Sequence, residues 1–341
     1  MRKMRVYCCL ATLFLSVVLL TGVTYGADKV IKLEFASYLP AQEGVSMMLQ
    51  EWCKEIEKKT NGRVAITFHP GGTLVPMPQT YDSVVSGMAD IGFAQFANSP
   101  GRFPMVELLD YPLGLKTSAD SIKLAREYVN KFKPKELSDV KLLFLVSTTP
   151  AVMHTKKPVS KLEDLKGRKI RTLGGPMVTA LKLLGAVPVV IPTVDVYDSA
   201  SKGVIEGTLS ALPGLVTFKW GEVLPNTVNN YRTSNCAINF AVMNKDKWNE
   251  LPPDIQQIID KTSDEYWDKG AKVWDQMTAD SIRTLTTAKH TFIPLTAAEE
   301  DRWVKEIAPL YDTYVKEKSA KGLPAAEAMK FVQDWVKKNQ K

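Results

Sequence analysis

Histidine and cysteine are scarce in this 341-residue chain, and their scarcity removes most routes to catalysis. The three histidines, at positions 69, 154 and 290, are widely separated, and there are four cysteines. The chain has no Walker-type phosphate loop, no Gly-x-Gly-x-x-Gly after a strand, no His-Glu-x-x-His and no Gly-x-Ser-x-Gly. Without clustered metal ligands or an activated nucleophile, the sequence offers no argument for an enzyme, a bound metal or a cofactor.

A strong excess of one charge is also missing. The formal net charge is +7, and it falls to +4 when Arg2, Lys3 and Arg5 of the N-terminal segment are left out. So small a charge on so long a chain is not that of a nucleic-acid-binding protein. With 45% apolar, 24% charged and 9% aromatic residues, the composition is close to that of an average soluble globular protein. The length favours about two domains.

Long apolar runs are absent apart from one at the N-terminus. Residues 1–7 carry three cations and no acid, residues 8–20 are almost entirely apolar, and small residues follow as far as Ala27. This order is typical of a secretory signal peptide, and we expect residues 1–26 to be removed by cleavage after Gly26 or Ala27. The alternative is a permanent membrane anchor, for which the apolar run is slightly short. The sequence therefore predicts an exported, periplasmic protein.

Export would place Cys53 and Cys236 in a compartment where disulfides form. Both cysteines lie among apolar neighbours, and neither has a histidine beside it in the sequence. This pattern favours two buried free thiols, while a bond between the two stays open on the sequence alone.

Short apolar strands alternate with helices in the first part of the mature chain. Strand patterns cover residues 30–36, 63–68 and 89–94, and helical patterns cover residues 42–59 and 77–88. Such alternation is typical of parallel βαβ units, in which helices cover a central sheet. We therefore expect an α/β domain here.

The same order of elements starts again in the middle of the chain. Residues 169–171 end a strand, residues 187–191 and 207–212 are extended, and residues 177–184 and 196–202 are helical. The amino-acid identities do not repeat, but the order of elements does. This indicates two similar domains.

The longest helical pattern runs from about Asp254 to Ala288. Proline does not interrupt it, and its one internal glycine is Gly270. At 1.5 Å per residue such a helix is about 50 Å long, which is longer than a small domain is wide. We therefore expect it to brace the two domains. Two more helices are expected around residues 297–318 and 325–338.

An arginine at the predicted end of a strand is the one positive sign of a binding site. Arg171 ends the strand pattern, and a Gly-Gly-Pro turn at residues 174–176 opens the next helix. Ligands of open α/β folds bind beyond the carboxyl ends of the strands. A guanidinium there, beside helix N-terminal amides, can pair with a carboxylate through two parallel hydrogen bonds. The alternative is a solvated arginine, as we assume for Arg168 and Lys169.

Short motifs are spread along the chain from the first strand to the long helix. They are Ala36-Ser37, Gly62-Arg63-Val64, Pro70-Gly71-Gly72-Thr73-Leu74, Gly87-Met88-Ala89-Asp90-Ile91-Gly92, Lys157-Pro158-Val159, the run from Leu162 to Arg171, Val196-Tyr197, Gly203-Val204-Ile205-Glu206-Gly207, and Met243-Asn244 before Leu251-Pro252. In this order they resemble the motifs of the extracytoplasmic solute-binding subunits of TRAP transporters (tripartite ATP-independent periplasmic, DctP-like). The resemblance covers nearly the whole mature chain.

The resemblance implies an α/β fold of the two-domain periplasmic solute-binding type. Each domain would be a mainly parallel sheet flanked by helices, with crossing strands and a long helix bracing both. We expect domain I to comprise residues 27–148 and 237–276, and domain II residues 149–236 and 277–341 with the C-terminal helices. Members of this family are not enzymes. They act mostly as monomers and deliver a captured solute, usually an organic acid, to a membrane permease driven by an ion gradient.

The resemblance also implies a role for Arg171. The family's arginine after the Lys-Gly-x-Lys-Ile stretch pairs with the substrate carboxylate, and Arg171 occupies that position. Two departures change the expected ligand: Ala151 stands where the sialic-acid branch has a second arginine, and Ser210 replaces a ligand-contacting asparagine. The pocket is then less polar than the sugar-acid type, which favours a smaller or more apolar monocarboxylate, including an aromatic one.

Other candidates for the pocket lie at predicted strand ends or in segments that line the cleft in this family. Each is as readily a wall or core residue as a ligand contact, and a histidine in such a place is more often structural. They are Tyr38, Thr73, Gln95, Phe96, His154, Trp220 and Asn235.

Three functions stay open on the sequence. In the first, a transport receptor closes when its ligand bridges both lobes and stabilises the closed state. The second is a sensory subunit that presents its ligand to a receptor kinase, which the sequence does not distinguish from the first. The third is an exported enzyme on a similar two-lobed scaffold, against which the missing nucleophile and metal ligands argue.

Overall fold

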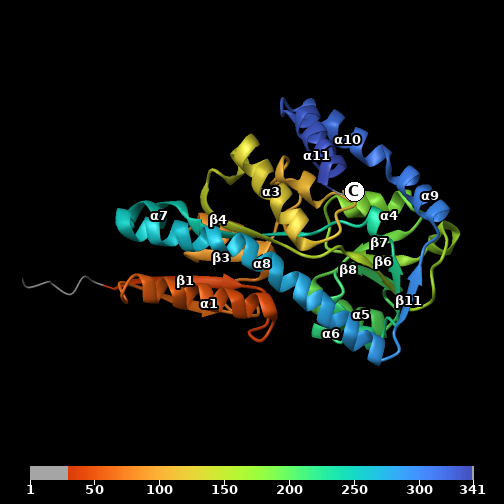
Figure 1. The fold of residues 1–341 in the computed structure, drawn as a ribbon, viewed down its shortest axis with the longest axis horizontal. Coiled ribbons are helices and arrows are strands. Elements are labelled where there is room, and N and C mark those ends of the chain that lie inside the picture. Colours follow the sequence, from red (N-terminus) through yellow and green to blue (C-terminus); the bar gives the residue numbers. More distant parts are fainter. Residues whose placement is uncertain (1–29, 340–341) are drawn as a thin grey trace, which may run out of the picture.

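The computed structural model describes residues 30–339, which form two α/β lobes joined by crossing segments and one long helix (Figure 1). The predicted signal peptide lies outside the described residues. Within them, the helices are all too short or too polar to cross a membrane.

Lobe I is built on a five-stranded sheet. Its strands are β1 (Ile31–Ser37), β2 (Val64–His69), β3 (Ile91–Gln95), β4 (Val140–Ser147) and β10 (Ile238–Asn244). They lie in the order β2-β1-β3-β10-β4. β1 is parallel to β2 and β3, whereas β10 is antiparallel to β3 and β4.

Lobe II is built on a six-stranded sheet. Its strands are β5 (Val152–Thr155), β6 (Lys169–Thr172), β7 (Val187–Val190), β8 (Gly207–Ser210), β9 (Asn226–Asn229) and β11 (Thr291–Pro294). They lie in the order β11-β9-β5-β8-β6-β7, with β5 antiparallel to both of its neighbours and the other pairs parallel. Both sheets are therefore mixed. In each, the strand that opposes its neighbours, β10 or β5, has just arrived from the other lobe.

Helices cover both faces of the sheets. The α-helices are α1 (Gly44–Lys59), α2 (Thr80–Val85), α3 (Ser118–Phe132), α4 (Pro176–Leu183), α5 (Val196–Ser201), α6 (Pro213–Thr217), α7 (Lys245–Glu250), α8 (Pro253–Thr287), α9 (Ala297–Ile307), α10 (Pro309–Ser319) and α11 (Ala325–Asn339). Short 3-10 turns are η1 (Met77–Gln79), η2 (Phe96–Asn98), η3 (Val106–Asp110), η4 (Lys135–Leu137), η5 (Leu162–Leu165), η6 (Thr193–Asp195), η7 (Trp220–Glu222) and η8 (Tyr231–Thr233). The helix expected at residues 297–318 is two helices, because Pro309 cannot donate an amide hydrogen bond and starts a new one.

The first helix shows how the sequence specifies this packing. The side chain of Glu43 caps α1 by accepting a hydrogen bond from the Ser46 amide at 2.9 Å. Apolar residues then recur at helical spacing and are buried against the rest of lobe I, while the opposite face of the helix carries lysine and glutamate. Those buried residues are Val45, Met48, Leu49, Trp52, Cys53 and Ile56.

Two segments cross between the lobes and run beside each other. Residues 148–151 connect β4 to β5, and residues 230–237 connect β9 to β10. The Thr148 amide donates to the Ala237 carbonyl at 2.9 Å, and the Ala151 amide donates to the Asn235 carbonyl at 2.8 Å. The connection between the sheets is therefore a pair of segments joined by main-chain hydrogen bonds.

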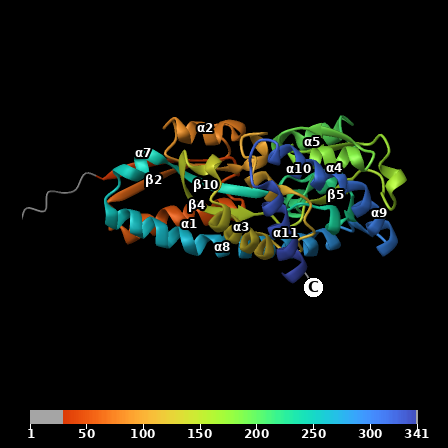
Figure 2. The ribbon, with the colours of Figure 1, turned by 90° about the horizontal axis from the view of Figure 1, so that it is seen from above.

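The predicted long helix is confirmed as α8, a 35-residue helix that braces both lobes. It packs against α1, α3 and β4 in lobe I and against α6 in lobe II. Seen from above in Figure 2, α8 runs along the molecule on the side of α1, and α2 and α5 lie on the other side. Gly270 permits this approach, because a Cβ there would lie 2.9 Å from a methyl group of Val146 on β4.

The C-terminal helices also reach both lobes. α9 packs against η5 and η8 in lobe II, and α11 packs against α3 in lobe I (Figure 1). Between them, the Tyr311 hydroxyl donates to the Pro112 carbonyl at 2.5 Å, and Lys318 forms an ion pair with Glu107 at 2.5 Å. The domain limits expected from the sequence stay a prediction, and α11 packs against both α10 and α3.

Cys53 and Cys236 are both buried and free, as their apolar neighbours indicate. Cys53 lies on α1, and Cys236 lies in the second crossing segment. Burial raises the pKa of both thiols, so neither is reactive at neutral pH.

Candidate functional site

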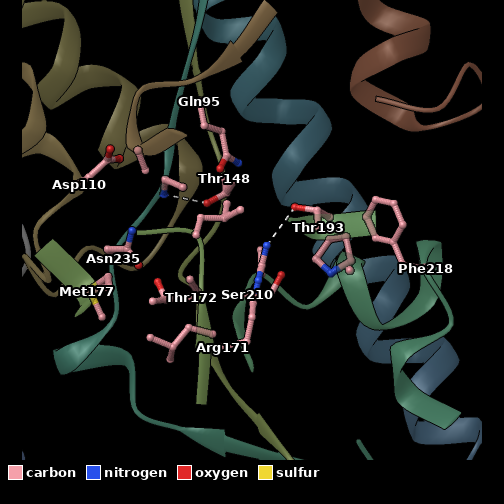
Figure 3. Close-up of a pocket in the computed structure, with 18 of the residues that line it drawn as sticks. Gln95, Asp110, Thr148, Arg171, Thr172, Met177, Thr193, Ser210, Phe218 and Asn235 are labelled. Atoms are coloured by element: carbon pink, nitrogen blue, oxygen red, sulfur yellow. Dashed lines mark hydrogen bonds between the residues drawn. The ribbon is translucent and has the colours of Figure 1, made fainter. Parts of the chain in front are cut away.

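A cavity lies between the lobes (Figure 3), and residues at the carboxyl ends of β1 and β3 in lobe I and of β6 and β8 in lobe II line it. It encloses about 870 Å³ of space that no atom fills, part of it open to solvent. The crossing segments and α8 supply the rest of the wall. Its position agrees with the rule that ligands of open α/β sheets bind beyond the carboxyl ends of strands.

Arg171 on β6 is buried in the wall of this cavity, with 2% of its surface exposed. Its Nε donates to the Ile191 carbonyl at 2.8 Å, and one terminal nitrogen donates to the Thr193 hydroxyl at 3.2 Å (Figure 3). Among residues 30–339, no carboxylate forms an ion pair with it. Burial lowers the pKa of Arg171 to about 9, and the nearby Tyr38 hydroxyl opposes this. The guanidinium is therefore a buried cation with unused donors.

The turn after Arg171 brings the two lobes close together. Gly174 and Gly175 both have positive φ, 125° and 61°, which side chains other than hydrogen rarely allow. A Cβ on Gly174 would lie 3.3 Å from the carbonyl oxygen of Ala97, which follows β3 in lobe I. Pro176 then begins α4, where its missing amide hydrogen costs nothing.

The lobe I wall is polar and carries no cation among the described residues. The Tyr38 hydroxyl donates to Asn239 Oδ1 at 3.0 Å and accepts from Gln95 Nε2 at 3.4 Å. The Tyr38 ring stacks on Phe93, with 6.1 Å between ring centroids and 7° between planes. Gln95 Oε1 is buried with no hydrogen-bond partner among the described residues.

Two buried carboxyl groups also line the cavity from lobe I. Glu43 caps α1, and Asp110 accepts a hydrogen bond from the Ile238 amide, where β10 begins, at 2.7 Å. Burial raises the pKa of each carboxyl group to about 7, and the amide hydrogen bonds oppose this. Each group is therefore neutral in a substantial fraction of molecules near neutral pH.

His154 lies behind the cavity wall rather than in it. It is fully buried, its Nδ1 lies 2.9 Å from the Thr227 hydroxyl, and its Nε2 lies 3.0 Å from the Ser210 carbonyl oxygen. Burial lowers the pKa of His154 to about 3, so the ring is neutral and its Nε2 donates to Ser210. His154 thus holds the end of β8, while Ser210 itself lines the cavity.

The remaining candidates divide between the cavity and its surroundings. Thr73 is exposed and donates to the Pro70 carbonyl, and Phe96 packs in the core against Phe103 and Phe240. The structure therefore leaves Thr73, Phe96 and His154 outside the cavity lining. It brings together Tyr38, Gln95, Arg171, Ser210, Trp220 and Asn235.

Comparison with known proteins identifies the chain. The model of the family of bacterial extracellular solute-binding proteins, family 7 (DctP), matches residues 35–318. The chain belongs to this family. The resemblance drawn from the short motifs is thereby confirmed.

Curated relatives of this family 7 protein match most of its length. It is 25% identical over 303 residues to the outer membrane transporter protein TsaT of Comamonas testosteroni, covering 86% of this chain and 87% of that protein. It is 24% identical over 278 residues to the C4-dicarboxylate-binding periplasmic protein DctP of Rhodobacter capsulatus, covering 80% and 83%.

Solved TRAP solute-binding proteins share the two-lobed fold. One from Rhodoferax ferrireducens T118, in complex with copurified benzoate, has a TM-score of 0.85 and 25% identity over 91% of this chain and 98% of that one. One from a marine metagenome, specific for aromatic acid ligands and co-crystallised with 3-hydroxybenzoate, has a TM-score of 0.86 and 25% identity over 92% and 99%. The chain is thus a TRAP-type extracytoplasmic solute receptor.

Several lining residues of this family 7 receptor escaped the sequence analysis. Glu43 had a weak signal, an acid just before a helix and shortly after a strand, whereas Asp110 lies in a segment without a motif. Trp274 and Met277 lie on the long helix, where the sequence indicated only that they belong to its apolar face. Phe218 stacks on Trp220, with 5.1 Å between ring centroids, and extends the aromatic wall.

Proposed function

We propose that the protein binds a small monocarboxylate, apolar or aromatic in its body, and that Arg171 pairs with the carboxylate. The supporting observation is the buried guanidinium of Arg171, which has no anionic partner among residues 30–339. A buried charge is costly unless an opposite charge and hydrogen bonds compensate it. A carboxylate ligand supplies both, through paired N–H···O bonds from the unused terminal nitrogens.

The rest of the cavity favours a ligand with one carboxylate and an apolar body. Arg171 is the single cation among the described lining residues, and Ala151 lines the cavity where a second arginine would stand in the sialic-acid branch. Phe218 and Trp220 form an aromatic wall, and Met177 adds an apolar side chain. Related proteins that bind benzoate and 3-hydroxybenzoate support the aromatic class.

Closure of the two lobes on the ligand is expected because binding groups lie on both of them. A ligand held by Arg171 in lobe II also faces Tyr38 and Gln95 in lobe I, so it bridges both lobes. It stabilises the closed state to the extent that it binds that state more tightly than the open one. The crossing segments at 148–151 and 230–237 are the expected hinge.

Family membership supports the remaining parts of the proposal. Such receptors work outside the cytoplasm, so we propose periplasmic location after removal of the signal peptide, and delivery of the acid to the membrane subunits of a TRAP permease. We propose a monomer without catalytic activity, cofactor or nucleic-acid partner. A sensory receptor with the same cavity is the second candidate, and it differs in its partner rather than in its ligand.

The test is thermal unfolding of the mature protein, stripped of ligand and screened against aliphatic and aromatic acids. A ligand at a thousand times its Kd stabilises the native state by about 4 kcal/mol, enough to raise the Tm by several degrees. We expect Arg171→Ala to abolish the shift and Arg168→Ala to preserve it, since Arg168 is half-buried outside the cavity lining and donates to the carbonyls of Lys157 and Pro158. Acids that still stabilise Arg171→Ala would contradict the assigned role.

A further inference from the structure

The side chain of Gln95 holds a hydrogen-bond acceptor that nothing in the described chain uses. Gln95 is the last residue of β3 and is 7% exposed, and it lines the cavity. Its Nε2 donates to the Tyr38 hydroxyl, whereas its Oε1 is buried and unpartnered among residues 30–339. Buried amide oxygens are nearly always paired, because an unpaired one loses the hydrogen bonds that it makes in water.

A chain of hydrogen bonds fixes which way round the Gln95 amide lies. It starts at the main-chain carbonyl of Val146 on β4, which can only accept, so Asn239 must present its Nδ2, at 3.2 Å. Asn239 Oδ1 is then left to accept from the Tyr38 hydroxyl at 3.0 Å. This uses the one proton of that hydroxyl, so Tyr38 can only accept from Gln95 Nε2.

The reversed amide is excluded by the same chain. Turning Gln95 around would place Oε1 against the Tyr38 oxygen, whose proton is already donated to Asn239. Two oxygens would then face each other without a proton between them. The orientation that leaves Oε1 free is therefore set by the β4 backbone.

Gln95 and Arg171 occupy opposite walls of the cavity, Gln95 on lobe I and Arg171 on lobe II (Figure 3). A ligand that fills the space between these walls therefore meets, in lobe I, an acceptor that has no donor of its own. We propose that the natural ligand carries a hydrogen-bond donor, a hydroxyl or N–H group, in addition to its carboxylate, and that Gln95 Oε1 accepts it. This inference rests on the proposed function and defines its ligand class more closely.

The test is calorimetric titration with matched pairs of acids. 3- and 4-hydroxybenzoate are each compared with the fluorobenzoate of the same position, which is similar in size but has no proton to donate. For one of the two positions, we expect the hydroxy acid to bind the wild-type protein at least about fivefold more tightly than its fluoro counterpart, the usual value of one hydrogen bond. In Gln95→Met this ratio should fall to about one or below.

Two further variants separate a direct contact from a general effect on folding. Gln50→Met makes the same substitution on α1 of lobe I, where Gln50 bonds to the carbonyls of Ala41 and Ser46, and it should keep the wild-type ratio. Tyr38→Phe removes the hydroxyl that orients Gln95 and frees the amide to turn. Its ratio should therefore fall even though Gln95 is intact.

The outcomes distinguish the inference from the proposed function. If neither the benzoates nor the aliphatic acids of the screen bind, or if binding survives Arg171→Ala, both are wrong. If the acids bind through Arg171 but hydroxy and fluoro acids bind equally at both positions, the inference alone is wrong. It is equally overturned if the preference for the hydroxy acid persists in Gln95→Met.

Discussion

The two walls of the cavity differ in chemistry, although both come from α/β sheets of similar design. The lobe II wall presents a buried cation, Arg171, at the end of β6. The lobe I wall presents an unpaired amide oxygen on Gln95 and the carboxyl groups of Glu43 and Asp110. The cation needs an anionic partner and the amide oxygen needs a hydrogen-bond donor, so a ligand that carries a carboxylate and a donor group satisfies both walls. Such a ligand contacts both lobes and bridges them.

The buried hydrogen-bond networks behind the walls differ in the same way. In lobe II the network joins His290, Thr227 and His154 and ends on the Ser210 carbonyl. The hydrogen bonds between them leave none of these four groups without a partner. In lobe I the network leads from Val146 to Gln95 and ends on an open acceptor. The lobe II network, in which each group has a partner, holds β8 in position, whereas the lobe I network ends on an acceptor that a ligand group can use.

The largest expected effect on ligand binding is the loss of the lobe II cation. Arg171→Ala should weaken benzoate binding by more than about a hundredfold, because a desolvated carboxylate loses its only cation. Gln95→Met should weaken hydroxybenzoate binding only severalfold, because it removes one neutral hydrogen bond. Calorimetric titration measures both. Equal losses in the two variants would contradict the distinction between the walls.

The next effect is on acid stability, through His154 in lobe II. Its pKa is about 3 in the native state and about 6.5 when unfolded, so protons bind on unfolding and stability is lost as the pH falls from about 6.5 toward 3. The loss is at most about 5 kcal/mol at 1.36 kcal/mol per pKa unit. In His154→Gln, which can make similar hydrogen bonds, urea unfolding should depend less on pH in this range. An unchanged slope would mean that His154 is not buried neutral.

Asp110 in lobe I should act in the opposite direction. Its pKa is about 7 in the native state against 3.8 when unfolded, so the contribution of Asp110 to stability is fully present below about pH 4 and is lost as the pH rises to about 7. The loss is at most about 4 kcal/mol. Asp110→Asn keeps an acceptor for the Ile238 amide and should gain stability relative to the wild type as the pH rises. A constant difference between the two proteins from pH 4 to 8 would contradict this.

The smallest effect tests the link between the brace and lobe I. Gly270→Ala on α8 would place a methyl group 2.9 Å from Val146, where the lobe I network begins. Overpacking of this kind costs about 1–3 kcal/mol. We expect a lower unfolding free energy and a smaller preference for hydroxybenzoate, with the pH slope due to His154 unchanged. Lys272→Ala, an exposed change two residues along α8, is the control.

Much of this fold could be predicted from the sequence because its elements carry local signals. α1 and α8 have apolar residues at helical spacing, and the strands β1, β2 and β3 alternate with helices in the way that parallel sheets require. Arg171 could be placed at a strand end because β6 and the Gly-Gly-Pro turn adjoin it.

The rest depends on contacts between residues far apart in the chain. The antiparallel insertion of β10 leaves no local mark, because all seven of its residues are buried and no alternation remains to be read. The bond from Tyr38 to Asn239 spans 201 residues, and that from Asp110 to the Ile238 amide spans 128. The orientation of the Gln95 amide in the lobe I wall therefore depends on β10, which is placed only when the chain returns from lobe II.

The most direct test of the account is a crystal structure of the mature protein with the tightest-binding hydroxybenzoate. We predict that the carboxylate accepts hydrogen bonds from the terminal nitrogens of Arg171 that face the cavity, with the ring beside Phe218 or Trp220. The hydroxyl should lie within hydrogen-bond distance of Gln95 Oε1. A carboxylate bound away from Arg171, with the guanidinium left unpaired, would contradict the central claim.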